Sequence, residues 1–340
     1  MADRSMFSYH ENRLFSKTCL CTTRGSNPST LSCLFSGITH LSFIGEKTRK
    51  KVYDAMEEIN YYPNEIARAL LNNRTYFVGV IVPTVTSPFH GEVVEQIEYY
   101  LSQKNYKMLL CNSKNQMDTE KAYIDMLRRN QVDGMIVGTH NAVVETYSKL
   151  KMPVVGIDRY LGEHIPVVSC DNYAAGQMAT RHLIDKGCQH ILCIRGNSKL
   201  KMPGNNRSQA YIQEMEKVGL PQMILEVPFI MENVEKQKLI YDMLNAHPEI
   251  DGIFAGDDSL AVIALHVARQ KGINIPKDLK IIGVDGTKQI LGFVPELTTI
   301  QQPVKQIAKV AVDKLIDLIE GKTAESCMDL PVKLLEGQTT

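Results

Sequence analysis

From residue 77 onward, short apolar runs alternate with amphipathic segments, and this alternation limits the folds open to the chain. The runs are FVGVIVP, MLLCNS, GMIVG, PVVGID, VVSCD, HILCIRG, MILEVP, GIFAGDD, LKIIGVDG and LTTIQQP. Segments such as GEVVEQIEYYLSQKN and SLAVIALHVARQKG separate them. Strands that are apolar throughout are typical of parallel sheets covered by helices on both faces. The runs are too many for one comfortable open sheet, so the pattern predicts an α/β protein with two doubly wound lobes.

The residues before the first run have helical character. In EKTRKKVYDAMEEIN, Val52, Met56 and Ile59 recur at helical spacing, which predicts an amphipathic helix that ends before the Tyr-Tyr-Pro sequence. Pro63 then permits a second short helix over 64–71. A short isolated helix of this second kind is marginal in water.

The stretch RGSNPSTLSCLFSG, over 24–37, contains the signals of a further helix. Asn27 can cap it, Pro28 suits its first turn, and Gly37 is a natural stop. By itself the pattern fits a helix that reads DNA, the remains of one, or an ordinary turn and helix.

Bulk composition excludes several classes of protein. The net charge of +0 gives no overall field that favours nucleic acid or a membrane, so any basic contact is local. No apolar run is long enough to cross a bilayer. The N-terminus lacks the apolar region of a secretory signal, and we therefore expect a cytoplasmic protein.

Catalytic, cofactor and metal motifs are missing from the sequence. The 8 cysteines lack the spacing of a zinc site, and Cys111, Cys170 and Cys193 lie in apolar runs, which predicts buried reduced thiols. No G-x-G-x-x-G follows the first run, and the GKT tripeptide at 321–323 lacks the upstream glycine of a phosphate-binding loop. Neither G-x-S-x-G nor H-E-x-x-H occurs. We predict a protein that is not an enzyme and that needs neither cofactor nor metal.

Carboxylates collect where the predicted strands end. They are Asp158, Asp171, Asp257, Asp258 and Asp285. Ligands of open α/β sheets bind beyond the carboxyl ends of the strands, so these acids stand where a ligand would be held. Acids at such ends also cap the next helix or turn, and both interpretations stay open.

A set of segments, in order from about residue 46 to the C-terminus, resembles one known family. The segments are EKTRKKVYDAMEEINYYPNEIARALLNNRTYFVGVIVPTVTSPF, VDGMIVG, PVVGIDR, SCDNYAAGQMATRHLIDKGCQHI, GNNRSQAYIQEME, FAGDDSLAVIAL, GINIPKDLKIIGVDGT and LTTIQQPVKQIAKVAVDKLIDLI. Any one piece is weak evidence, but the ordered set is specific. The chain resembles the LacI/GalR family of sugar-responsive transcriptional repressors.

The resemblance implies a periplasmic-binding-protein-like core of two lobes, preceded by a helix-turn-helix headpiece and a hinge helix. The headpiece would occupy 1–62, with 1–45 atypical, and the hinge helix and linker 63–75. The lobes would occupy 76–172 with 302–327, and 173–301 with 328–340. The resemblance also implies a homodimer that binds a palindromic operator and no membrane.

A small sugar or sugar acid bound between the lobes would control the protein allosterically. The implied effector contacts are Ser87, Phe89, Asp158, Arg159, Asp171, Arg207, Phe229, Asp257, Asp285 and Gln302. The family usually has Asn-Asp where this chain has Asp257-Asp258, which alters the hydrogen-bond polarity there. Arg159 and Arg207 suit an acidic ligand, and the spacing of SFIGEKTRKK resembles regulators of the ketodeoxygluconate type. Either arginine can instead pair with a neighbouring aspartate.

The resemblance also assigns the DNA contacts. They would be Ser29, Thr30 and Ser32 in the recognition helix, and Tyr62, Asn64, Ala67, Arg68 and Leu70 around the hinge. Paired copies of Leu70 would wedge into the minor groove and kink the DNA. In the family the stretch at 24–37 usually reads AGVSPSTVSRVLNG, so Arg24 replaces a small residue and Cys33 a basic one.

These departures leave alternatives to a working repressor. The headpiece can be eroded, or partly misread by a local frame error, which would leave a sugar-binding protein that no longer reads DNA. A periplasmic sugar-binding protein shares the core, but it carries a secretion signal and no hinge helix. A sugar-processing α/β enzyme is the remaining alternative, and no catalytic constellation supports it.

Overall fold

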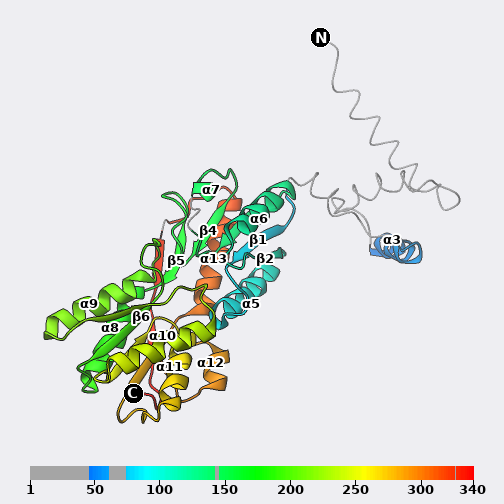
Figure 1. Ribbon diagram of the computed structural model, residues 1–340. Coiled ribbons are helices and arrows are strands. Elements are labelled where there is room, and N and C mark those ends of the chain that lie inside the picture. The colour runs from blue at the N-terminus through cyan, green and yellow to red at the C-terminus, as the bar shows by residue number, and fades with distance from the viewer. Residues whose placement is uncertain (1–45, 61–73, 142–144, 326) are drawn as a thin grey trace. The chain divides into compact units, whose positions relative to one another are not determined.

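The computed structural model describes residues 46–60, 74–141, 145–325 and 327–340, and the chain divides into a unit over 1–75 and a unit over 76–340 (Figure 1). In the first unit, α3 (Glu46–Glu58) confirms the amphipathic helix expected there. The second helix predicted over 64–71 and the helix at 28–36 lie outside the described residues.

Within the described part of the second unit, two six-stranded sheets confirm the predicted pair of doubly wound lobes. The first has the order β11-β5-β4-β3-β1-β2 and the second β12-β10-β9-β8-β6-β7. Every pairing is parallel except that of β12 with β10. The strands of the first sheet are β1 (Phe77–Val82), β2 (Lys107–Asn112), β3 (Gly134–Val137), β4 (Val154–Ile157), β5 (Val167–Cys170) and β11 (Cys327–Leu330). Those of the second are β6 (Ile191–Arg195), β7 (Met223–Glu226), β8 (Gly252–Ala255), β9 (Lys280–Asp285), β10 (Thr298–Gln301) and β12 (Lys333–Leu335).

Helices cover both faces of each sheet, as the continuous apolar strands require. In the first lobe, α5 and α13 pack on one face and α6 and α7 on the other. In the second lobe, α10 and α11 cover one face and α8 and α9 the other. The helices are α5 (Pro88–Gln103), α6 (Met117–Arg129), α7 (Glu145–Ser148), α8 (Asn172–Asp185), α9 (Asn205–Val218), α10 (Asn233–Ala246), α11 (Asp258–Gln270), α12 (Lys288–Phe293) and α13 (Val304–Ile319). Cys111, Cys170 and Cys193 are buried free thiols, as predicted.

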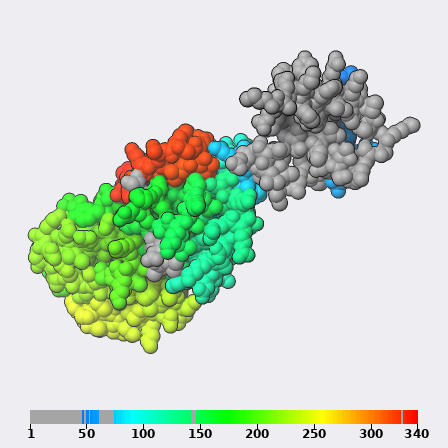
Figure 2. Space-filling model, turned by 90° about the horizontal axis from the view of Figure 1, so that it is seen from above, coloured from blue at the N-terminus to red at the C-terminus, as the bar shows by residue number. Residues whose placement is uncertain are grey.

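The chain crosses between the two sheets three times: after β5, after β10 and after β11. The second crossing returns α13 to the first lobe, where it packs beside α5 (Figure 1); in Figure 2 the orange-red C-terminal segment lies against the cyan and green atoms of that lobe. Strand β11 pairs with β5 as far as Leu330, so the third crossing follows Leu330 rather than the expected boundary at 327. No helix among the described residues is long and apolar enough to span a membrane.

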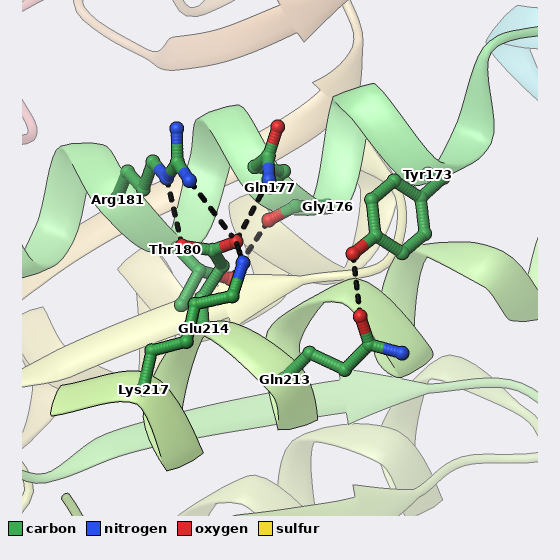
Figure 3. Close-up of polar contacts among 8 residues, drawn as sticks. All are labelled: Tyr173, Gly176, Gln177, Thr180, Arg181, Gln213, Glu214 and Lys217. Carbon is green, nitrogen blue, oxygen red and sulfur yellow. Dashed lines mark hydrogen bonds and ion pairs between the residues drawn. The ribbon is translucent and has the colours of Figure 1, made fainter. Parts of the chain in front are cut away.

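Helices α8 and α9 pack closely because a glycine lies at their crossing. A methyl group on Gly176 would overlap the backbone of Arg207, in the first turn of α9. Further along the same helix pair, the buried carboxylate of Glu214 accepts hydrogen bonds from Arg181 Nε (2.7 Å), Lys217 Nζ (2.6 Å) and Gln177 Nε2 (2.7 Å) (Figure 3). Burial by itself would raise the pKa of Glu214, but these donors outweigh it and lower the pKa to about 2. The carboxylate therefore stays charged and fastens α9 to α8.

We expect Glu214→Gln to lower the free energy of unfolding at neutral pH by about 2 kcal/mol, because a neutral amide cannot replace the charge-assisted bonds. The advantage of the wild type should shrink as the pH falls from the ordinary glutamate value toward 2, since the folded carboxylate protonates only there. Urea denaturation at several pH values measures both effects.

Tyr173→Phe is the matched control, because it removes a hydrogen bond between the same two helices, from Tyr173 Oη to Gln213 Oε1 (2.6 Å; Figure 3). A neutral, partly exposed bond of this kind contributes about 1 kcal/mol or less. Equal losses in the two variants would contradict the role assigned to Glu214.

Candidate functional site

One cavity of about 780 Å³ opens between the two lobes, at the carboxyl ends of their parallel strands. From the first sheet it is lined by residues that follow β1, β2, β3 and β4, and from the second by residues that follow β6, β7, β8 and β10 and by Asp285, which ends β9. Its volume lies within the range of small-molecule sites. This is the position at which open α/β sheets bind ligands.

The structure brings most of the predicted effector contacts together in the wall of this cavity. They are Ser87, Phe89, Asp158, Arg207, Phe229, Asp257, Asp285 and Gln302. Phe89 is largely buried against the first core, whereas Ser87 precedes α5 and its hydroxyl makes no capping bond to that helix. The eight side chains come from both lobes and from the crossing between them.

Two predicted contacts do not line the cavity, and each has a structural role instead. Asp171 caps α8, with Oδ1 accepting a hydrogen bond from the backbone N–H of Ala174 at 2.8 Å. Arg159 is buried and donates to the backbone oxygens of Asn141 and Lys201, each at 2.9 Å. Its guanidinium thus joins the loop after β3 to a loop of the other lobe, and Arg159 is not among the residues that line the cavity.

Arg207 is held by groups from several elements. Its Nε donates to Asn172 Oδ1 (2.7 Å) and its Nη1 to the backbone oxygen of Gly256 (2.7 Å). Its Nη2 lies 3.9 Å from the sulfur of Cys170. Burial favours a lower pKa for Arg207, but Cys170, Asp285 and Asp158 outweigh it and raise the pKa. The guanidinium is therefore a fixed positive charge in the cavity wall.

Asp285 stands at the end of β9 in a conformation that few non-glycine residues adopt, with φ of 132°. Gln302 fixes it: the side-chain Nε2 donates to Asp285 Oδ1 (2.7 Å) and the backbone N–H donates to the Asp285 backbone oxygen (2.9 Å). Asp257 lines the cavity and also caps α11, accepting from Leu260 N at 2.8 Å. Asp257 therefore both caps α11 and faces the cavity, so both interpretations of this residue apply.

Asp258 lies beneath the cavity rather than in its wall. It is 1% exposed and accepts from Thr299 Oγ1 (2.6 Å) and from the backbone N–H of Gly286 (2.7 Å). Burial raises its pKa to about 7 against the effect of these two bonds. The carboxylate joins the start of α11 to the loop after β9 and to β10, and so supports the backbone around Asp285.

Asp158, Asp257 and Asp285 lie around Arg207 in the cavity wall, and burial raises the pKa of all three carboxyl groups. Burial raises the pKa of Asp158 and of Asp257, and Arg207 opposes the shift in both cases. Burial and repulsion from Asp258 raise the pKa of Asp285 well above its ordinary value. A carboxylate accepts hydrogen bonds from hydroxyl groups, and a protonated carboxyl can also donate one.

Several cavity residues escaped the sequence analysis. The main ones are His90, Asn115, His140, Arg195 and Asn197. Asn115, His140 and Asn197 follow strands by two or three residues and Arg195 ends one, so polar residues at strand ends are the signal for these four. His90 lies in the first turn of α5, where no such signal marks it.

Comparisons with known proteins agree with this geometry. A family described as periplasmic binding proteins and sugar binding domain of LacI family matches residues 75–336. A sucrose operon repressor of Pediococcus pentosaceus is 38% identical, covering 89% of this chain and 93% of the relative. A ribose operon repressor of Halalkalibacterium halodurans is 33% identical, covering 88% and 89%. The structure of a periplasmic binding protein/LacI transcriptional regulator from Alkaliphilus metalliredigens, complexed with D-xylulofuranose, is 29% identical with a TM-score of 0.71 and covers 78% of this chain and 99% of that one.

We expect Asp258→Asn to flatten the pH dependence of stability between about 4 and 7. The unfolded chain loses this proton near the ordinary aspartate value and the folded chain only near 7, so the wild type loses stability as the pH rises across that window. Asparagine does not titrate, and its amide can still donate to Thr299 and accept from Gly286. Urea denaturation at intervals across the window gives the two slopes.

Asp278→Asn is the control, because Asn274 holds the pKa of this exposed carboxyl below its usual range. That variant should keep the decline seen in the wild type. An unchanged decline in Asp258→Asn would show that this carboxyl does not carry the effect.

Proposed function

The chain belongs to the LacI/GalR family of transcriptional regulators, and from this we propose that it represses genes of carbohydrate metabolism under the control of a sugar bound between its lobes. The observation that carries the proposal is the cavity between the two sheets, in whose wall the polar side chains of Arg207, Asp285, Asp257 and Gln302 converge. Regulation of this kind needs no catalytic step, and we assign the protein neither enzymatic activity nor a cofactor. Its place of action would be the cytoplasm, where the operator is.

The effector best supported by the chemistry of the cavity is a neutral sugar rather than a sugar acid. Arg159, one of the two arginines that suggested an acidic ligand, does not line the cavity and instead donates to the backbone oxygens of Asn141 and Lys201. Arg207 is surrounded by Asp158, Asp257 and Asp285, which disfavour a further anion. The relatives and the solved structure named above concern sucrose, ribose and D-xylulofuranose, which are neutral. The subgroup that regulates sugar-acid metabolism stays a prediction without support from these relatives.

DNA recognition would belong to the residues before the core. The proposed contacts all lie outside the described residues, and they rest on the family pattern: Ser29, Thr30, Ser32, Tyr62, Asn64, Ala67, Arg68 and Leu70. A homodimer would present two recognition helices to the half-sites of a palindromic operator. The headpiece would span 1–62 and the hinge 63–75, and each lobe would be a discontinuous domain whose last boundary follows Leu330.

Sugar and DNA would act on each other through the movement of the lobes. Closure on a ligand would shift the two hinge segments of a dimer, and the coupling of the two binding events must be reciprocal. Its free energy is typically about 1–3 kcal/mol. The same linkage serves induction or corepression, according to which lobe arrangement the operator favours.

A sugar-binding protein that no longer reads DNA is the second candidate function. Arg24 and Cys33 favour it, because the first replaces a small residue at the expected turn and the second removes an expected basic contact. In that case the core would still bind sugar, and the chain would bind DNA only weakly and without sequence preference.

We expect the full chain to select palindromic duplexes from a random library, with an affinity that falls steeply as salt is raised. Leu70→Ala should weaken binding to the selected duplex by more than about tenfold, since the wedge into the minor groove is lost. Leu71→Ala is the matched control. Fluorescence anisotropy measures both, and failure to enrich any duplex would favour the second candidate function.

We expect Arg207→Lys to weaken sugar binding by more than about tenfold while leaving binding to the selected duplex unchanged. A lysine has a single ammonium group in place of the fork that contacts Asn172, Gly256 and the cavity. Isothermal titration with neutral sugars and anisotropy with the duplex separate the two effects. Equal losses of both would indicate a folding defect instead, and the melting temperature of the variant distinguishes it.

A further inference from the structure

The cavity has two ends of different chemistry. Gln302, Asp285 and Asp158 follow or end β10, β9 and β4, which lie near the crossings between the lobes. His90, His140 and Phe229 follow β1, β3 and β7, which lie toward the opposite side of the two sheets. We call the first group the crossing end and the second group the outer end. The crossing end presents acids around one guanidinium, whereas the outer end presents aromatic rings.

At the outer end, several polar atoms are shielded from solvent without a partner. His90 Nδ1, His140 Nδ1 and Asn115 Oδ1 have no hydrogen-bond partner among the residues that the structure describes. Buried polar atoms are almost always satisfied, and atoms left open in the wall of a cavity point to a bound molecule. Gln302 Oε1 is open in the same way at the crossing end. The two ends therefore each offer unsatisfied groups to a ligand.

The rings of the outer end come from both lobes and form one cluster. The centroids of His90 and His140 lie 5.7 Å apart, and that of Phe229 lies 4.3 Å from His140 and 6.0 Å from His90, all with edge-to-face geometry. Lys236 Nζ donates to the backbone oxygen of Phe229 (3.4 Å), which anchors that loop. Aromatic surfaces pack against the apolar C–H face of a sugar ring, while imidazole nitrogens reach its hydroxyls.

Both imidazoles are uncharged at neutral pH. Burial, and then repulsion from His140, lowers the pKa of His90 to about 3. Burial, and then repulsion from Arg159, lowers the pKa of His140 to about 4. The pair therefore attracts no anion, and each ring has one donor and one acceptor nitrogen, which matches the dual character of a hydroxyl group.

We propose that the outer end, formed by His90, His140, Asn115 and Phe229, is a subsite for the second ring of a neutral disaccharide whose first ring occupies the crossing end. The inference rests on the proposed sugar-binding function and specifies the size of the effector. The cavity of about 780 Å³ has room for both rings. A monosaccharide would leave the open nitrogens of the outer end unsatisfied.

The test is isothermal titration of the full chain with sucrose, maltose, lactose and cellobiose, and with glucose, fructose and galactose. At least one disaccharide should bind more than about tenfold more tightly than either of the monosaccharides that compose it. If each disaccharide binds no better than its components, the second-ring subsite is wrong although the proposed function stands. If neither class binds, the proposed function itself fails.

Variants then locate the second ring. His140→Ala and Phe229→Leu should weaken binding of the tightest disaccharide by more than about fivefold. The affinity for whichever of its two monosaccharides binds more tightly should change by less than about twofold. His140→Asn, which keeps a polar atom near the position of Nδ1, should recover much of the loss. Asp285→Asn, at the crossing end, should weaken binding of the disaccharide and of the monosaccharide by the same factor. Melting temperatures verify folding, and losses of equal size for both ligands in His140→Ala and Phe229→Leu would overturn the proposal.

Discussion

The site depends on a single guanidinium held among acids. Arg207 contacts Asn172 at the first crossing, Gly256 after β8 and Cys170 at the end of β5, so it joins elements of both lobes. Asp158, Asp257 and Asp285 surround the same charge and would repel one another more strongly without it. A group in this position contacts both lobes and defines the polarity of the cavity that they enclose.

Sequence patterns anticipated the architecture but not all of its parts. Ten apolar runs became ten strands, and eight of them lie inside the sheets, where a strand must be apolar on both faces. The edge strands β11 and β12 were not predicted, since they are short, contain only exposed and half-buried residues and leave no continuous apolar run. Acids at strand ends were equally ambiguous. Asp257 both caps and faces the cavity, Asp171 only caps, and the difference lies in rotamer and neighbours that a sequence does not display.

The contact between the two cavity histidines could not be predicted from the sequence. His90 and His140 lie far apart in the chain and become neighbours because β3 pairs with β1, which places the residues that follow these strands side by side. No spacing of residues along the sequence indicates such a pair. Once the sheet order is known, the asymmetry of the cavity follows, because loops from the crossing side supply acids and loops from the outer side supply rings. A ligand that satisfied only one end would leave buried polar atoms open at the other, which costs free energy.

The packing of α8 against α9 connects this chemistry to the rest of the molecule. Helix α8 begins where the chain first crosses between the lobes, and Asn172 in its first turn lies beside both Arg207 and Asp158. Gly176 allows the backbone of Arg207 to approach α8, and the Glu214 network fastens the two helices about two turns further along α9. A ligand that binds Arg207 therefore contacts a side chain held in a closely packed helix pair. Because that pair starts at the first crossing, we expect a ligand bound to Arg207 to act on the crossing as well.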